Sequence, residues 1–433
     1  MKRIFFLSLL LVGFAHLVQA QETLRLPDAV NIALQNSLDL KIAKNRVLAD
    51  SINDHIGVAG GLPLVTSTIA DNEQVTSVNQ KLNTGTEIKK SNAAANNFNA
   101  GITGSILLYN GGRVVATKKR LGEQKLQSDQ LLNAQVQNVL ADVMTAYYDI
   151  VRQQNYIKTI DTSIAASKKQ LDIVQIRQQA GLANNADLFQ AQIDLNVLQQ
   201  SRLAQELVIG QAKTELLRLL TLPGDSSISI VDSIVVDPSL NLSAVLSSLN
   251  KNADLQAADK QVRINELIVK ETSAQRYPSI RATTGYNFSR NQAAAGNILL
   301  NQNYGPTVGV SIGIPIYNGS IFKRQQRVAG INVQNAQLQK DILYRDYSSQ
   351  AIKQFQSYSN TIQQLDTALQ NYNLSQKLLN LALLRFQYKQ ATILEVKSAQ
   401  QSFEESGFRL VNLRFAAKSA EIELKRLSNT LTW

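Results

Sequence analysis

Residues 98–112 of the chain read FNAGITGSILLYNGG, and this stretch decides the fold. Apolar or small residues occupy every second position from Phe98 to Leu108, and the positions between them are mainly polar, which predicts a β-strand with one apolar face. The Asn-Gly-Gly at its end favours an abrupt change of direction. From Gly112 to about Ala180 no proline interrupts the chain, so a long helix is expected directly after the strand.

The expected helix is far longer than a globular domain uses. Some 70 residues with a rise of about 1.5 Å each would reach roughly 100 Å. Apolar residues recur along it at every seventh position, at Val136, Val143, Ile150, Ile157, Ile164 and Leu171. This spacing is typical of a coiled-coil seam. Residues 181–185 then predict a turn into a second helix that ends near Leu222, so the two helices form a hairpin.

The chain repeats itself. Tyr109-Asn110-Gly111 returns 208 residues later as Tyr317-Asn318-Gly319, whereas the offset is 215 nearer the N-terminus. The seam returns with the same 208-residue offset as Tyr344, Ala351, Tyr358, Leu365, Tyr372 and Leu379. We predict two structural repeats, 21–222 and 241–433, joined by a linker at 223–240. The first repeat would consist of a helix, a β-hairpin at about 64–108 and a long helical hairpin at about 112–222. The second would consist of a helix, a β-hairpin at about 279–316 and a long helical hairpin at about 319–428.

The strands of the two hairpins have the length of membrane strands. Residues 280–288 and 308–316 alternate clearly, residues 64–76 are taken as a strand by symmetry, and the polar residues 72–96 and 291–303 are expected to be external loops. A tilted strand needs about 9 to 11 residues to cross a bilayer. A hairpin of an ordinary β-sandwich would alternate in the same way. If the strands lie in lipid, four of them cannot close even a barrel of about eight strands, so several chains must complete one barrel.

The N-terminus and the charge indicate an exported protein. Residues 1–20 have the pattern of a signal peptide, with Lys2 and Arg3 before an apolar run, and a weakly cleaved anchor is the alternative. The formal net charge of +11 becomes +9 without these two residues. Because the basic residues are spread along polar helix faces without interleaved aromatics, nucleic acid is not expected as a partner.

The composition gives no support to an enzyme or a metalloprotein. The chain has no cysteine, and His55 is the only histidine after residue 20. Metal ligands come in clusters, so we expect His55 to be a packed or solvated residue of a helix that runs to about Gly60. No glycine-rich phosphate loop or catalytic constellation is recognisable, and we expect no cofactor.

The order, duplication and spacing of these features resemble the TolC-like outer membrane efflux family along the whole mature chain. Residues 24–29 (LRLPDA) and 33–36 (ALQN) are similar to its N-terminal signature. The residues similar to its strand-to-helix hinges are Asn110, Gly111, Gly112, Asn318 and Gly319. The resemblance implies a mainly α fold with a β-barrel portion, in which long α-helical coiled-coil hairpins form a periplasmic tunnel. Four transmembrane β-strands per chain would contribute to a trimeric twelve-stranded barrel.

The resemblance also implies a function. The chain would be a channel subunit of a tripartite efflux pump or type I secretion system in the outer membrane of a Gram-negative bacterium, extending into the periplasm. Its partners would be two further copies in a homotrimer, a periplasmic adaptor (membrane fusion) protein and an inner-membrane pump. A periplasmic coiled-coil adaptor or scaffold is the rival interpretation, although an adaptor normally has one helical hairpin rather than two. The transported substrate stays open.

A gate is implied where the helices converge at the tips. The family pattern places it at Asp187, Glu395 and the aromatic Phe386, which would be an apolar plug. An inward Glu395 would form a ring of carboxylates in a symmetric oligomer. In the alternative interpretation, both acids only complement the dipole of the helix that they begin.

The resemblance also implies a lock, a basic residue that ties the second tip to Asp187, and this sequence departs from that pattern. The sequence has Ala391 at the position of this basic residue and Ser398 where a second ring of acids would be expected. Lys389 or Arg385 is the candidate that could take its place as the lock.

The tip residues expected to contact an adaptor are Gly181, Leu182, Ala183, Gln390, Ala391 and Thr392. The alternative is that these are simply good helix-turn-helix residues.

Overall fold

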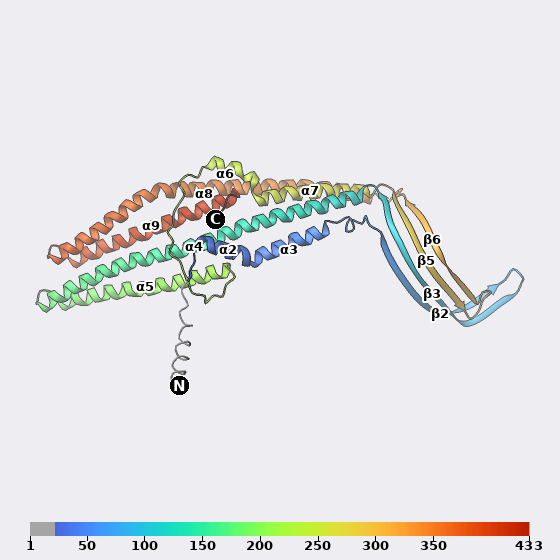
Figure 1. Ribbon diagram of the computed structural model, residues 1–433, viewed down its shortest axis with the longest axis horizontal. Helices are drawn as coiled ribbons and strands as arrows, with labels where there is room; N and C mark the ends of the chain where they lie inside the picture. Colours follow the sequence, from blue (N-terminus) through green and yellow to red (C-terminus); the bar gives the residue numbers. More distant parts are fainter. Residues whose placement is uncertain (1–21, 433) are drawn as a thin grey trace, which may run out of the picture. The chain divides into compact units, whose positions relative to one another are not determined.

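The computed structural model describes residues 22–432, and the predicted signal peptide lies outside this range (Figure 1). The α-helices and β-strands of this range are β1 (Glu22–Thr23), α2 (Leu26–Asn36), α3 (Leu38–Asn53), β2 (Leu64–Lys81), β3 (Glu87–Asn110), α4 (Arg113–Gln179), α5 (Asn185–Leu219), β4 (Ile228–Ser229), α6 (Leu242–Ser248), α7 (Ala253–Ala274), β5 (Ser279–Ala293), β6 (Leu300–Gly313), α8 (Ile321–Gln387) and α9 (Ile393–Leu427). The predicted fold class, long helical hairpins with four long strands per chain, is confirmed.

The chain forms two compact units, and each takes segments from both halves. The helical unit contains residues 22–44, 130–256 and 342–432. The sheet unit contains residues 45–129 and 257–341. Neither unit corresponds to a single half of the sequence.

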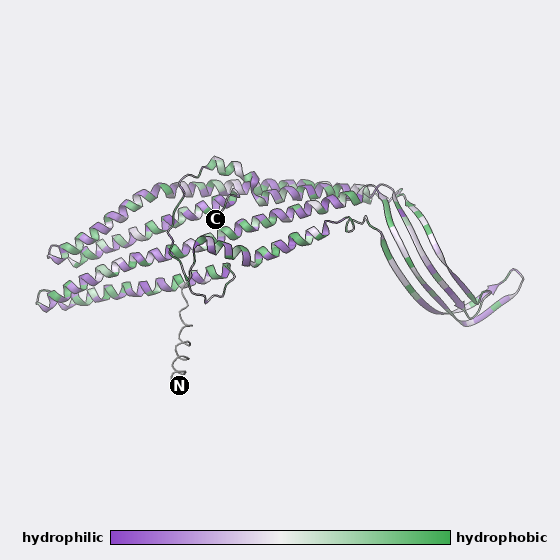
Figure 2. Ribbon diagram, viewed as in Figure 1, coloured by the Kyte–Doolittle hydropathy of each residue, from purple (hydrophilic) through white to green (hydrophobic). Residues whose placement is uncertain are grey.

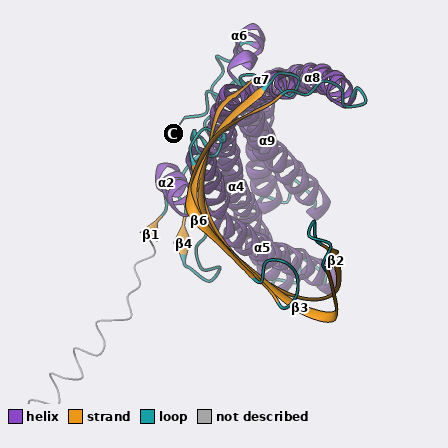
Figure 3. Ribbon diagram, turned by 90° about the vertical axis from the view of Figure 1, so that its right-hand side faces the viewer, coloured by secondary structure: helices purple, strands orange, loops and turns teal. Residues whose placement is uncertain are grey.

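The core of the sheet unit is a four-stranded antiparallel sheet in the order β2-β3-β5-β6, which curves in Figure 3. Residues directly opposite each other in neighbouring strands point to the same face. Ile102 lies opposite Tyr286, and Ala282 opposite Val310, so the apolar positions of successive strands share one face. The strand β2, predicted only by symmetry, is present and pairs with β3 along almost its whole length.

The predicted external loops are mostly strand, which corrects the prediction. β2 continues to Lys81 and β3 begins at Glu87, so residues 82–86 alone connect them, in place of residues 72–96. β5 ends at Ala293 and β6 begins at Leu300, which leaves residues 294–299 in place of residues 291–303. Polar side chains on both faces hide the period of two, but the ladder hydrogen bonds depend on the backbone and continue through them.

In the helical unit, α4 runs beside α5, and α8 runs beside α9 (Figure 1). Val143, Ile150 and Ile164 of the predicted seam are buried, as are Ala351 and Tyr358 of its repeat. The main hydrophobic cluster joins α4 to α2, to the end of α5 and to the linker after α5. Burial of the heptad positions therefore holds the long hairpins together.

The second helix is shorter than predicted. α2 and α3 are separated at Ser37, but α3 ends at Asn53 rather than near Gly60. His55 follows in a turn, where its Nδ1 accepts a hydrogen bond of 3.1 Å from the Gly57 N–H. A side chain that takes a backbone donor in this way competes with helical hydrogen bonding.

The linker after α5 is tied to the helices by buried polar groups. The completely buried Tyr147 donates a hydrogen bond of 3.0 Å to the Leu24 carbonyl and also bonds Asp232. In α9, Glu421 is 2% exposed and lies 3.0 Å from the Lys418 Nζ and 2.8 Å from the Lys425 Nζ. Its second oxygen accepts the N–H of Asp237, so the linker is fixed to α9.

Hydrophobic and hydrophilic residues are interspersed along the long helices in Figure 2. Within residues 22–432, every helix falls short of the combined length and apolarity that crossing a membrane would require.

Candidate functional site

The first helical tip lies between α4 and α5. Gly181 has a φ of +71°, a left-handed conformation that allows the chain to reverse. Asn184 caps α5, because its side-chain oxygen accepts the Asp187 N–H at 2.8 Å. Asp187 thus stands in the first turn of α5, as the helix-dipole interpretation requires, and it forms no ion pair within the described chain.

The second tip, between α8 and α9, repeats the first with an offset of 208 residues. Lys389 takes the place of Gly181 and has a φ of +61°, while Thr392 takes the place of Asn184 as the cap of α9. Thr392 and Glu395 form a capping box, in which each side chain accepts the other's backbone N–H at 3.2 Å. The Glu395 carboxylate also lies 3.7 Å from the Arg385 guanidinium, with both side chains about half exposed.

Phe386 is packed between the two hairpins. Its side chain is 2% exposed and belongs to a cluster with Val174 of α4, Ala191 of α5 and Val396 of α9. The Arg177 guanidinium stacks 4.5 Å from the centre of the ring and donates a hydrogen bond to the Phe386 carbonyl oxygen. A plug formed by this ring would require the hairpins to rearrange.

The contacts between the hairpins are made by residues that the sequence did not single out for this role. Beyond Arg177, Lys397 of α9 lies 2.8 Å from a carboxylate oxygen of Asp194 on α5. Within residues 22–432, neither expected lock residue forms a hydrogen bond or ion pair to the other hairpin. Arg385 pairs with Glu395 and donates to the Gln390 carbonyl, and the Lys389 N–H donates to the Phe386 carbonyl, all within one hairpin.

A sequence signal for the second contact exists. Lys397 stands 208 residues after Phe189, and Asp194 stands 208 residues before Ser402. Each charge therefore occurs in only one half of the duplicated chain, and the two charges have opposite sign. Charges that break an internal repeat are candidates for contacts between its halves.

The residues expected to be strand-to-helix hinges lie between β3 and α4 and directly before α8. Gly111, Gly112 and Gly319 have φ of +68°, +81° and +65°. Glycine is required at Gly111, since an added Cβ would lie 2.6 Å from the carbonyl oxygen of Ala274. Asn110 caps α4 by accepting the Val114 N–H at 3.3 Å.

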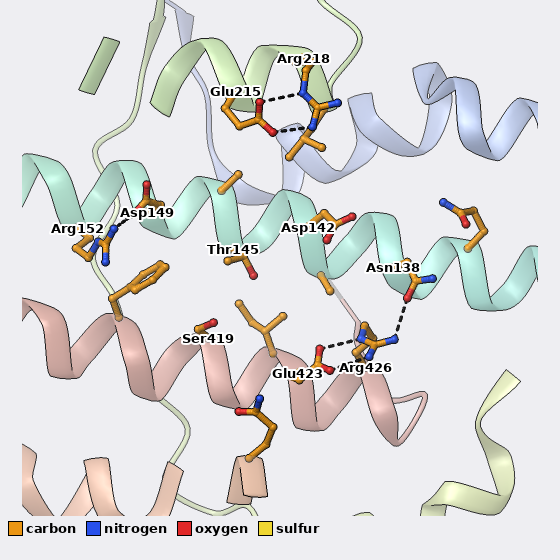
Figure 4. A pocket seen from close by; sticks show the side chains of 17 residues that line it. Asn138, Asp142, Thr145, Asp149, Arg152, Glu215, Arg218, Ser419, Glu423 and Arg426 are labelled. Atoms are coloured by element: carbon orange, nitrogen blue, oxygen red, sulfur yellow. Dashed lines mark hydrogen bonds and ion pairs between the residues drawn. The ribbon is translucent and has the colours of Figure 1, made fainter. Parts of the chain in front are cut away.

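A polar cleft of about 1120 Å³ lies between α4, α5 and α9 in the helical unit (Figure 4). Three arginines reach it, and each is paired with an acid three residues earlier on its own helix. These pairs are Asp149 with Arg152, Glu215 with Arg218, and Glu423 with Arg426. Burial raises the pKa of the remaining acid, Asp142.

Six of the charged residues that line the cleft thus form three ion pairs, each within a single helix. The cleft has the composition of a solvated polar surface. Within residues 22–432, no group of three or more acids or histidines is placed to hold a metal ion.

Comparison with known proteins identifies the family. The chain matches the family described as "Outer membrane efflux protein" over residues 29–224 and 245–430. Outer membrane protein TolC of Vibrio cholerae serotype O1 is 23% identical over 318 residues, which cover 71% of this chain and 71% of that protein. Proteases secretion protein PrtF of Dickeya chrysanthemi is 23% identical over 349 residues, covering 78% of this chain and 74% of that protein.

Solved structures share the fold over almost the whole chain. The outer membrane protein VceC from Vibrio cholerae has a TM-score of 0.75 at 18% identity and covers 93% of this chain and 96% of its own. The channel-forming protein CusC has the same TM-score and identity, with coverage of 94% and 92%. Because the family match extends over most of both halves and the fold agrees with it, this chain belongs to the outer membrane efflux protein family.

Proposed function

We propose that this chain is the outer-membrane channel subunit of a tripartite efflux pump or type I secretion system. The subunit would passively conduct substrates that an inner-membrane transporter and an adaptor deliver, across the periplasm and the outer membrane. The observation that carries this proposal is the open sheet. β2 and β6 are its outermost strands, so each has one edge whose backbone groups find no partner within the sheet.

An open sheet edge is incompatible with lipid, where each unsatisfied backbone group costs several kcal/mol. The apolar face nevertheless fits lipid, since Val308, Val310 and Ile312 are 87%, 66% and 62% exposed. Pairing of β6 of one copy with β2 of the next satisfies both edges and keeps this face outward. We infer a homotrimer with twelve strands, in agreement with the family resemblance.

The helical hairpins also support assembly from copies. Phe189, Ile193 and Val197 form an exposed apolar row on α5 with a spacing of four residues. A second exposed apolar row on α8 comprises Leu374, Leu378 and Leu381, with spacings of four and three residues. Side chains at these spacings share one face of a helix. We infer that neighbouring copies cover these rows.

We further propose that the tips hold the gate. Glu395, Asp187 and Phe386 remain the gate residues, and Arg177 and the Lys397–Asp194 pair hold the two hairpins of one chain together in the closed state. What supports this is that these contacts cross from one hairpin to the other, whereas the capping bonds of Glu395 and Asp187 stay within a hairpin. Opening then requires these crossing contacts to break.

The partners follow from the family resemblance. We propose that the tip residues Gly181, Leu182, Ala183, Gln390, Ala391 and Thr392 contact a periplasmic adaptor. Apart from Leu182, which is 61% exposed, they are small or polar, so a partner's helical hairpin could approach closely. The conducting role requires no catalytic group, and we infer that the chain is a passive channel rather than an enzyme.

Cross-linking tests the shared barrel directly. The chain contains no cysteine, so any disulfide must come from introduced residues. Thr68→Cys on β2 is combined in turn with Thr307→Cys, Gly309→Cys and Ser311→Cys on β6, all on the same face of the sheet. We expect one register to give a ladder that ends at three chains in denaturing gels, whereas each single cysteine gives no ladder.

The rival adaptor function predicts a different outcome. A coiled-coil adaptor would be extracted without detergent, would show no ladder and would give no conductance in planar bilayers. A water-soluble monomer without conductance would therefore refute the channel.

A further inference from the structure

One face of the sheet is polar but almost uncharged. The register places Thr66, Ser105, Thr283 and Ser311 on this face, together with further Asn, Ser, Thr and Gly residues. Between residues 64–74, 95–107, 279–293 and 300–313, Arg281 is the only charged residue on this face. In a membrane barrel the polar face lines the lumen.

Arg281 lies near the helical end of the sheet, and a second arginine lines the same cavity. It is the third residue of β5 and pairs with Leu107 and Ser311. Arg113, the first residue of α4, shares with it a cavity of about 640 Å³ within the sheet unit. No Asp or Glu lines this cavity, and neither arginine forms an ion pair within the described chain.

The charge of the surrounding unit has the same sign. The sheet unit contains 19 Lys and Arg residues against 11 Asp and Glu residues. Arg290 and the acids Asp71 and Glu73 belong to the opposite face and lie toward the turn end of the strands. They therefore do not neutralise Arg281.

We propose that Arg281, with Arg113, forms an anion-binding ring inside the barrel at its helical end, so that the channel favours small oxyanionic solutes such as carboxylates and phosphates. This inference rests on the proposed channel function and names its solute class. Rings of arginine select anions in pores. The planar guanidinium donates two parallel hydrogen bonds to a carboxylate or phosphate, which adds recognition to attraction.

Reversal potentials across a KCl gradient in planar bilayers test the proposal. We expect Arg281→Gln to lower the permeability of chloride relative to potassium, and Arg113→Gln to change it in the same direction. Arg281→Lys keeps the charge and should keep the wild-type value. Arg290→Gln, on the opposite face, is the matched control and should leave the reversal potential unchanged.

Salt and a polyvalent anion sharpen the test. The difference between wild type and Arg281→Gln should grow at low salt, because the screening length increases from about 8 Å at 0.15 M to about 30 Å at 0.01 M. Citrate added on the side of the β-turns should reduce the wild-type current, and Arg281→Gln should lose this block.

The outcomes separate this inference from the channel itself. Absence of wild-type conductance would refute the proposed function. Conductance with the same reversal potential in wild type, Arg281→Gln and Arg113→Gln, or an equal shift in Arg290→Gln, would overturn the anion ring and leave the channel intact.

Discussion

Replacing Arg177 by glutamine should open the periplasmic tips. The Arg177 guanidinium donates a hydrogen bond to the Phe386 carbonyl oxygen and stacks on the Phe386 ring. Glutamine is neutral and shorter, so both interactions are lost while a polar side chain remains on the surface of α4. The helical hairpin itself should persist, because the buried seam residues are untouched.

The expected effect is large for one side chain. A hydrogen bond with a charged partner contributes about 1.5–3 kcal/mol, and a cation–π contact adds about 0.5–1 kcal/mol at a partly exposed site. Each subunit would therefore lose about 2–4 kcal/mol of closed-state stabilisation, which corresponds to roughly 30- to 1000-fold in the closed-to-open equilibrium.

Single-channel recording in planar bilayers measures this effect. We expect Arg177→Gln to raise the conductance and to lengthen the open periods. The matched control is Arg385→Gln, which removes the equivalent arginine of the second half. Its exposed 3.7 Å pair with Glu395 stays within one hairpin and should contribute less than about 1 kcal/mol.

The reasoning fails if Arg177→Gln conducts like the wild type while remaining folded and inserted. It also fails if Arg385→Gln opens the channel to the same extent, since contacts within a hairpin would then control the gate.

Three further predictions concern the helical unit. Glu421→Ala leaves the almost buried Lys418 without its partner and should lower the free energy of unfolding by about 3–5 kcal/mol, measured by denaturant titration in detergent. Hydrogen bonds from Ser239, and then Lys425, lower the pKa of Asp237 from 3.8 to about 2. The stabilisation is therefore present above pH 3.8 and is lost as the pH falls toward 2, so thermal melts should show a component of acid sensitivity that Asp237→Asn lacks. Gly407→Ala would place a Cβ 2.7 Å from the Thr159 Cγ2 and should cost about 1–3 kcal/mol, which Thr159→Ala in the same chain should partly restore in a double-mutant cycle.

The helical tips show where prediction from sequence reaches its limit. The tip turns and the capping acids Asp187 and Glu395 could be located, because cap residues follow turns at fixed spacing. The contacts that cross between the hairpins could not, since Arg177 and Phe386 are 209 residues apart and their contact depends on helix packing. A local pattern carries no information about which face of one long helix meets the other.

The anion ring depends on the same distinction. Alternation in residues 280–288 already separated Arg281 from the apolar face. That no other charge shares its face within residues 64–74, 95–107, 279–293 and 300–313 became evident only from the register of four strands, because pairing and a bulge between Leu107 and Tyr109 decide which residues are neighbours.

The sequence by itself determined the elements and their order. The duplication, the heptad spacing, the alternating strands and the glycine hinges are local or periodic signals, and each follows from backbone geometry. Tertiary structure alone decided how far the strands extend, since residues 72–81 and 87–96 are strands despite their polarity. It also decided which side chains join the hairpins and which charge stands on the polar face of the sheet. Strand length, the contacts between the hairpins and the charge on the polar face depend on ladder hydrogen bonds and on packing between distant segments. A single strand or helix shows no periodic pattern for either kind of interaction, because both partners are needed to define it.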